Sequence, residues 1–209
     1  MPFLLRVELP DVPGSLGRVA TAIGMAGGDI EAIEIVEKRH DGTAVDDVLL
    51  EIAPGTMPDS IVSACNLLDG VRVVWISRYA AGGNLVLDLE AVEELTVDPE
   101  DALGRLVDLL PVTFRADWAV RVSKTDGVVQ ATEAAPSELS WVSIERAAML
   151  EPTDENTIMC GAKLNKTEIV VIGRRGGPEF LESEIARLGH LAGLAMSISR
   201  RATAPSGSA

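Results

Sequence analysis

The stretch LPDVPGSLGRVA, residues 9–20, decides how the first part of this chain folds. Two prolines, an aspartate and a glycine in its first half are typical of a loop that follows a strand. From its second half onward, Leu16, Val19 and Ile23 recur at the spacing of one helical face. The mostly apolar residues 3–8 before it predict a strand. The chain therefore begins with the order strand, loop, helix.

The following residues predict four more elements of the same small domain. Strands are expected over residues 29–37 and 44–52, joined by an Asp41-Gly42 pair that suits a tight hairpin. A second helix is expected over residues 61–68 and a last strand over residues 71–79. The resulting order, βαββαβ, is that of the ferredoxin-like α+β fold.

The last strand of this domain is apolar on both sides. Because side chains alternate along a strand, Val71, Val73 and Trp75 should face one side of the sheet. Val74 and Ile76 should then face the other. Two helices can cover only one face, so a second copy of the chain or its carboxy-terminal half is expected to cover the second.

Small residues at 80–84 mark the best domain boundary, because they separate two regions of regular apolar spacing. The predicted division is a ligand-binding domain over residues 1–80 and a second domain over residues 81–201. The short tail at residues 202–209 is small and polar, and we expect it to be disordered.

The second domain predicts an antiparallel sheet flanked by helices. Residues 85–92 favour a helix, although their alternating leucines would also suit a strand. Asp98 and Pro99 are expected to open the next helix, as its cap and its first residue. Further elements are expected as paired strands at residues 116–123 with 128–133, as paired strands at 157–164 with 167–173, and as a final helix from Pro178 to residue 201.

The composition argues against several classes of function. The chain has 209 residues and a formal net charge of −14, and only 3% of its residues are aromatic. An acidic surface repels a phosphate backbone, so no nucleic-acid partner is expected. No apolar run reaches the roughly 18 residues of a membrane helix, and no secretory leader is evident. We therefore expect a cytoplasmic protein with no membrane partner.

Residues that often carry chemistry are isolated in this sequence. Cys65 and Cys160 lie in apolar stretches, far from another Cys or His at metal-ligand spacing. His40 and His190 have no nucleophile and acid arranged around them. The glycines within residues 173–177 fit neither a dinucleotide-binding nor a Walker pattern. We expect no metal, no cofactor and no catalysis.

The loop and helix at residues 9–20, with the later Gly28 and Asp29, resemble the signature of ACT domains. The resemblance covers residues 3–79 and implies a regulatory domain that binds a small molecule, most often an amino acid, and pairs into a homodimer. Many relatives have an asparagine where this chain has Asp29. The matching positions are Asp11, Pro13, Gly14, Leu16, Gly28 and Asp29.

The same loop has the physical features of a binding site. Free N–H groups of Gly14, Ser15 and Leu16 at the helix start would accept a carboxylate, while Asp11 or Asp29 would meet an amino group. The alternative interpretation is that the Pro-Gly turn only starts a helix. The predicted ligand-binding residues are Asp11, Val12, Pro13, Gly14, Ser15, Leu16, Asp29 and Ile30.

The second domain has a weaker resemblance, to GAF-type sensory domains. Residues 114–127 look like the opening of that family, and residues 169–180 look like its close. The stretch between them is short, which favours a role in dimerisation or partner binding. Trp118, Trp141 and Met149 would line a pocket if this domain keeps one, although such isolated apolar residues more often belong to a core.

Together these features predict a non-enzymatic regulatory protein. It would sense a small molecule, most often an amino acid, through its ACT domain and relay binding through dimerisation or the GAF-like domain. The alternative is a ligand-free dimerisation or adaptor module for a separate enzyme or transcription factor. That alternative predicts stable dimers that do not respond to amino acids.

Overall fold

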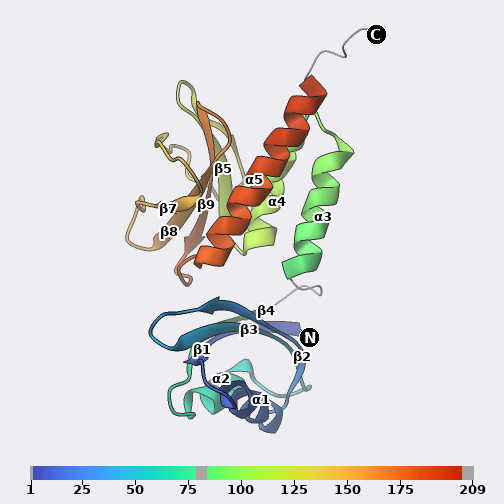
Figure 1. Ribbon diagram of the computed structural model, residues 1–209, viewed down its shortest axis with the longest axis vertical. Helices are drawn as coiled ribbons and strands as arrows, with labels where there is room; N and C mark the ends of the chain where they lie inside the picture. Colours follow the sequence, from blue (N-terminus) through green and yellow to red (C-terminus); the bar gives the residue numbers. More distant parts are fainter. Residues whose placement is uncertain (1, 79–83, 204–209) are drawn as a thin grey trace. The chain divides into compact units, whose positions relative to one another are not determined.

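The computed structural model describes residues 2–78 and 84–203 and has a mixed α+β architecture with two antiparallel sheets (Figure 1). The chain divides into two compact units, Met1–Gly83 and Asn84–Ala209. The boundary expected at residues 80–84 lies outside the described residues, apart from Asn84, which begins a helix. No helix within the described ranges is long and apolar enough to cross a membrane.

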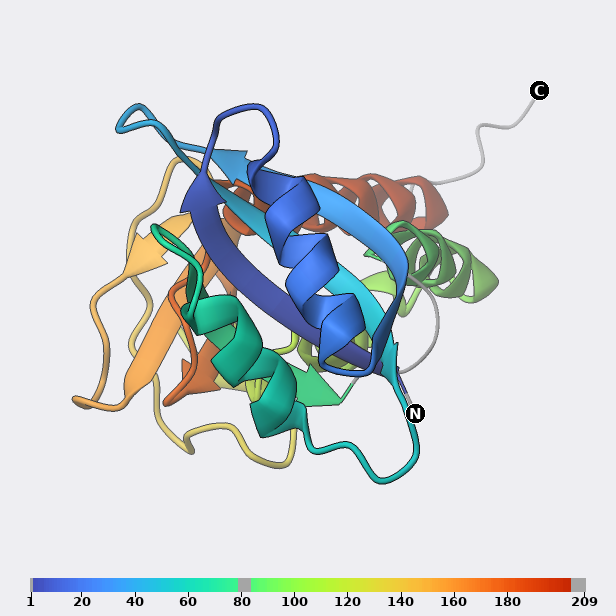
Figure 2. The same cartoon turned by 90° about the horizontal axis from the view of Figure 1, so that it is seen from below.

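The first unit has the predicted βαββαβ order. Its sheet has the strand order β2-β3-β1-β4 with antiparallel neighbours, and α1 and α2 lie over one face of it (Figure 2). The ferredoxin-like prediction is therefore confirmed. The elements are β1 Pro2–Pro10, α1 Ser15–Met25, β2 Gly28–Lys38, β3 Thr43–Ile52, α2 Pro58–Asn66 and β4 Arg72–Arg78.

The core of the first unit lies between this sheet and its two helices. Alternate residues of β1, among them Leu5 and Val7, are fully buried against the helices. Val19 and Ile23 of α1 and Ile61 of α2 meet them from the other side, because these residues form one face of each helix. The apolar spacing noted in the sequence is thus the spacing of the core.

A β-bulge in β4 changes which side chains face the helices. Arg6 pairs with Trp75 while the next residue, Val7, pairs with Val73, so Val74 is left out of the regular pairing. Val73 and Ile76 therefore both pack on the helix-covered core, and Trp75 lies beside Arg6 on the opposite face. The prediction of strict alternation from Val71 to Ile76 is wrong because it assumed an unbroken strand.

The face of the sheet opposite α1 and α2 also carries charged groups that pair with one another. Arg6 Nε donates to Asp47 Oδ1 at 2.7 Å, and its Nη2 donates to Asp47 Oδ2 at 2.9 Å. Glu8 accepts from Arg39 at 2.6 Å and from Arg72 at 2.9 Å. The expectation of an apolar second face is therefore correct only in part.

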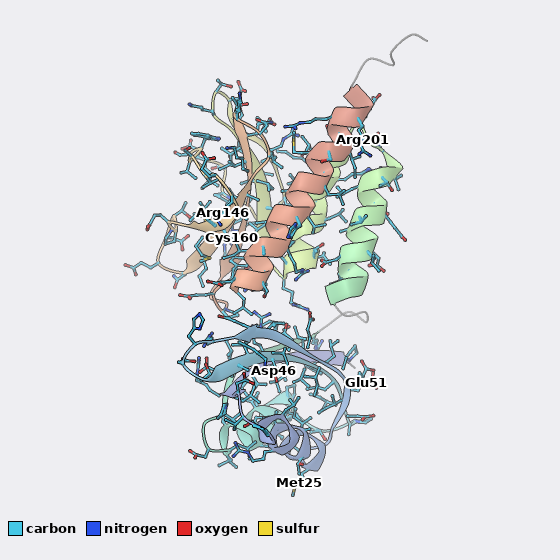
Figure 3. All side chains as sticks on the ribbon, in the orientation of Figure 1. Met25, Asp46, Glu51, Arg146, Cys160 and Arg201 are labelled. Atoms are coloured by element: carbon cyan, nitrogen blue, oxygen red, sulfur yellow. The ribbon has the colours of Figure 1, made fainter. Side chains whose placement is uncertain are left out.

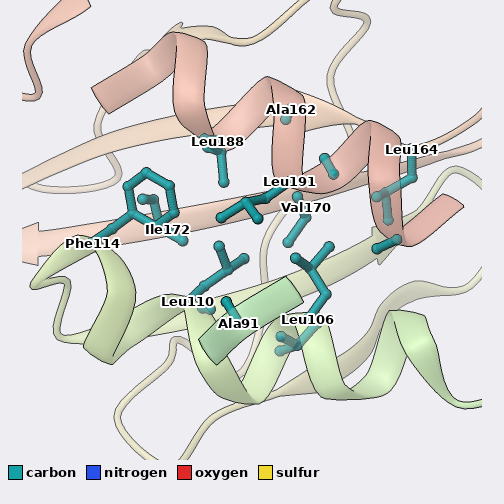
Figure 4. Packing of buried hydrophobic residues seen from close by; sticks show 14 of the residues in the cluster. Ala91, Leu106, Leu110, Phe114, Ala162, Leu164, Val170, Ile172, Leu188 and Leu191 are labelled. Carbon is teal, nitrogen blue, oxygen red and sulfur yellow. The ribbon is translucent and has the colours of Figure 1, made fainter. Parts of the chain in front are cut away.

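The second unit is an antiparallel sheet with helices packed on one face, as predicted. The strand order is β6-β5-β9-β8-β7, and α4 and α5 pack against the sheet while α3 packs on both of them. Figure 4 shows side chains from these helices and from β8 and β9 filling the space between. The elements are α3 Asn84–Val97, α4 Ala102–Phe114, β5 Trp118–Ser123, β6 Gly127–Ala131, β7 Ala148–Leu150, β8 Thr157–Lys163, β9 Glu168–Arg175 and α5 Glu182–Thr203.

Several boundaries in this unit differ from the predictions. Helix α4 begins at Ala102 with Asp101 as its cap, because residues 98–101 form a turn closed by Asp101 N–H and Asp98 O at 3.2 Å. Helix α5 begins after residue 181 and includes Ala202 and Thr203, so the predicted tail does not start at residue 202. Residues 204–209 lie outside the described residues. The short strand β7 was not predicted, because three residues carry too weak a pattern.

Candidate ligand site at the start of helix α1

The loop between β1 and α1 is held in place by its own backbone. Asp11 N–H donates to Gly42 O in the β2–β3 hairpin at 2.8 Å, and Ser15 N–H donates to Val12 O at 3.2 Å. Gly14 has φ +92°, a conformation that L side chains rarely adopt, although open space surrounds the position of a Cβ atom there. The glycine is thus required by the backbone turn that starts the helix.

The start of α1 presents backbone donors to the exterior. Within the described residues, the N–H groups of Gly14 and Leu16 have no hydrogen-bond partner, whereas that of Ser15 is used inside the loop. Of the three N–H groups expected to be free, those of Gly14 and Leu16 are free within the described residues and that of Ser15 is not. These donors lie at the positive end of an 11-residue helix, a favourable place for a carboxylate.

Lys38, the last residue of β2, reaches this loop. Its Nζ lies 3.2 Å from Asp11 Oδ1 and 3.1 Å from Asp11 Oδ2. Both side chains are partly exposed, at 60% for Lys38 and 39% for Asp11. The pair neutralises Asp11 at the mouth of the loop.

A buried carboxyl group lies on the helix-covered face of the sheet. Asp46 pairs with Val7 in the register of β3, which puts its side chain on the same face as the core, and only 2% of the residue is exposed (Figure 3). Its Oδ1 has no hydrogen-bond partner in the described part of the chain. Burial, reinforced by the negative charges of Asp11 and Asp47 and opposed by Lys38, raises the pKa of Asp46 to about 6. Asp46 follows Thr43 by three residues, and Thr43 pairs with Pro10 at the end of β1, so Asp46 lies at the loop end of the sheet.

Ser15 provides a second buried polar group without a partner. It is the first residue of α1, only 2% exposed, and it shares the sheet-facing side of the helix with Val19 and Ile23. No described group bonds its Oγ. An unsatisfied buried polar group costs about 1–3 kcal/mol, so two of them at one end of the sheet require an explanation.

Asp46 was not among the predicted site residues, although the sequence contains a signal for it. Positions 44, 46, 48 and 50 alternate onto the core face of β3, and three of them are apolar. A lone acid in such a series is expected to be either paired or functional. Asp47, its neighbour, points to the other face and pairs with Arg6, so these two adjacent acids do not face a common site.

The other two predicted site residues lie elsewhere in the chain. Asp29 and Ile30 begin β2 and pair with Glu51 and Leu50, whereas the loop joins the strand pair at Thr43. The stretch of β3 between these points corresponds to about 26 Å. Within one chain, the structure therefore brings together residues 11–16 but not Asp29 and Ile30.

The second unit has a concavity of its own, of about 1080 Å³, on the face of its sheet opposite α4 and α5. Trp141 and Met149 line it, and Lys124 Nζ lies 5.0 Å from the centre of the Trp141 ring. Trp118, in contrast, is buried in the core beneath. Of the three residues considered for a pocket, two line this concavity and one is structural.

The first unit thus has a ferredoxin-like fold with a glycine-containing loop at the start of α1. Residues 3–56 match the family model of the ACT domain, and the chain therefore contains an ACT domain at its amino-terminal end. One curated relative is NAD-dependent malic enzyme 1 of Bacillus subtilis (strain 168), which is 36% identical over 103 residues. The match covers 49% of this chain and 23% of that enzyme, so the chain spans about a quarter of the length of the curated relative it matches.

Two solved structures show more distant similarity. The GAF domain from an Acinetobacter phosphoenolpyruvate-protein phosphotransferase is 13% identical, and the match covers 59% of this chain and 96% of that domain with a TM-score of 0.45. A formyltetrahydrofolate deformylase from Pseudomonas putida KT2440 is 9% identical, and the match covers 95% of this chain and 93% of the other with a TM-score of 0.35. Neither similarity says what this chain binds.

Proposed function

We propose that this chain is a non-enzymatic, cytoplasmic regulatory protein whose ACT domain binds an amino acid at the start of α1. The observation that carries the proposal is a pair of buried atoms, Asp46 Oδ1 on β3 and Ser15 Oγ at the start of α1, that have no hydrogen-bond partner among the described residues. Leaving such groups unsatisfied destabilises the folded chain. A ligand that supplies their partners would remove this penalty on binding.

An α-amino acid has the two charged groups that suit this place. Its carboxylate would accept hydrogen bonds from the N–H groups of Gly14 and Leu16, which have no partner among the described residues. Its ammonium group would donate to Asp46, because Lys38 already neutralises the alternative acid, Asp11. Ser15 Oγ would bond either group of the ligand, since a hydroxyl can both donate and accept.

A second copy of the chain gives Asp29 and Ile30 a role in the same proposal. Within one chain they lie about 26 Å of strand away from the loop, so they would contact the ligand only from a partner. Their strand, β2, is an edge of the sheet and carries the exposed Ile35, as a strand that pairs with another copy would. We therefore propose a homodimer in which binding changes the association of the two copies or the response of the second unit.

The test is a thermal-shift screen of the purified chain against the twenty amino acids. A ligand at 100 times its dissociation constant adds about 2.7 kcal/mol, which raises the midpoint by several degrees. We expect one or a few amino acids to do so, and we expect Ser15→Ala and Asp46→Asn to lose the response. Thr21→Ala, on the same helix but with its hydroxyl bonded to Gly17 O, should keep it.

Other outcomes would decide between the alternatives. A stable dimer that no amino acid affects would favour the adaptor role for a separate enzyme or transcription factor. The non-enzymatic part of the proposal would fail if the purified chain reduced NAD in the presence of malate, the assay suggested by the relative's name.

A further inference from the structure

A second site lies in the second unit, in a groove of about 1070 Å³ beside α5. One wall is helix α5. The others are residues 145–148, which lead into β7, and residues 162–166, which end β8 and follow it; Arg146 is labelled in Figure 3. The basic side chains that line it are Arg146, Lys163, Lys166, His190 and Arg200.

The charge of this groove is opposite to that of the chain as a whole. The chain has 32 acidic residues and 18 Lys and Arg residues, whereas the groove has two acids, Glu145 and Glu182, and four Lys or Arg. Lys163 pairs with the largely exposed Glu145 at 3.1 Å. Positive charge gathered in a concavity of an otherwise acidic protein attracts and orients an anionic partner.

The shape of the groove favours an extended partner over a small ion. Its lining residues on α5 lie from Glu182 to His190 and, near the end of the helix, at Arg200, which is about 27 Å from Glu182 along the helix axis. The charges are spread along this length, and small side chains such as Ala147, Ala186 and Gly189 form much of the remaining wall. A peptide main chain can approach small residues closely, while its acidic side chains reach the separated cations.

The end of β8 borders the groove. Strand β7 pairs with Met159, Cys160 and Gly161 of β8, and the pairing ends there. Ala162, which is fully buried, and Lys163 continue β8 beyond this pairing and line the groove. The contribution of β8 to the groove is therefore the side chain of Lys163, which adds to its positive charge.

From these observations we propose that the groove binds an acidic, extended peptide segment of a partner protein. The acidic side chains of the segment pair with Arg146 and Lys166, which lie on the exposed rim, while its backbone lies along the small residues of the wall. The site uses no residue of the α1 loop and does not depend on the amino-acid proposal.

The test uses the full chain and a fluorescein-labelled peptide of twelve residues that alternate glutamate and alanine. We expect saturable binding by fluorescence anisotropy, weakened by added salt, and about tenfold weaker with Lys166→Glu or Arg146→Glu. Arg201→Glu is the matched control, because Arg201 is also exposed and lies on α5 but does not line the groove. All three variants should keep the thermal midpoint of the wild type, since each side chain is exposed.

Three results would overturn the proposal. The first is absence of saturable binding at millimolar peptide. The second is an equal loss of peptide affinity with Arg201→Glu, which would show non-specific attraction. Equal binding of a peptide with lysine in place of glutamate would show the same. The third concerns a dimer of the wild-type chain in sedimentation. If Lys166→Glu dissociates this dimer and the peptide does not, the occupant of the groove is a second copy of the chain.

Discussion

Lys38 Nζ contacts both carboxylate oxygens of Asp11, at 3.2 and 3.1 Å, and so links the end of β2 to the loop that starts α1. The contact joins residues that are 27 positions apart and satisfies the exposed acid of the loop. Asp46, buried nearby, is then the acid whose charge is least compensated. This difference between two acids at one loop is the basis of the first two predictions.

Replacing Lys38 by methionine should raise the pKa of Asp46 above its value of about 6, because Lys38 is the positive charge that opposes the effects of burial, Asp11 and Asp47. The free energy of unfolding should change by less than about 1 kcal/mol, since the Lys38–Asp11 pair is partly exposed. An NMR titration of the Asp46 carboxyl carbon measures the first effect. Lys124→Met, in the second unit, should leave the titration unchanged.

Replacing Asp46 by asparagine should stabilise the chain in a pH-dependent way. The pKa of Asp46 is raised from 3.8 to about 6 in the folded state, so its ionisation opposes folding. The penalty is absent below pH 3.8 and complete above pH 6, and it corresponds to about 3 kcal/mol at about 1.4 kcal/mol per pKa unit. Urea unfolding of both proteins at pH 4 and pH 7 measures it. A stability difference that is the same at both pH values would contradict the assignment.

Replacing Gly173 by alanine should destabilise the second unit by about 3 kcal/mol or more, because the new Cβ would overlap the buried ring of Trp118. Gly173 lies in the middle of the sheet, paired with Trp118 and Met159, so the backbone has little freedom to move away. Gly193→Ala is the control, since open space surrounds that position on α5. This change should stabilise the helix by about 0.5–1 kcal/mol. Equal midpoints for the two variants in thermal unfolding would refute the prediction.

Replacing Arg174 by methionine should cost about 3–5 kcal/mol, the usual effect of removing one partner of a buried ion pair. The guanidinium donates to Phe114 O and Pro178 O, both at 2.8 Å, and to Glu184 at 3.2 Å. It also donates to Arg115 O at 3.2 Å and to Glu179 O at 3.5 Å, so its removal leaves four carbonyl groups and a carboxylate without this donor.

The neighbouring Arg175 offers a matched control for that experiment. It is exposed and donates from its side chain to Ala134 O at 3.1 Å. Arg175→Met should therefore change the free energy of unfolding by less than about 1 kcal/mol in denaturant titrations. A similar loss in both variants would mean that Arg174 acts through its charge alone and not through its buried bonds.

The order of elements could be predicted because it depends on short-range patterns. The spacing of Leu16, Val19 and Ile23 and the turn at Asp41-Gly42 are local, and the structure has the helix and the hairpin where these patterns predicted them. The start of α4 was misplaced because Pro99 suits a turn as well as a first helical turn. Local chemistry allowed both, and only the completed packing selected one.

The candidate site depended on contacts that no local pattern contains. The sequence by itself determined the glycine turn at residues 11–16 and the two layers of the first unit, because φ preferences and apolar spacing act over a few residues. Only the tertiary structure decided that Asp46 is buried at that loop, that a bulge turns Trp75 to the other face, and that Arg146, Lys166 and Arg200 line one groove. These placements arise from strand register and helix packing between residues far apart in the chain, where a shift of one position reverses the face that a side chain occupies.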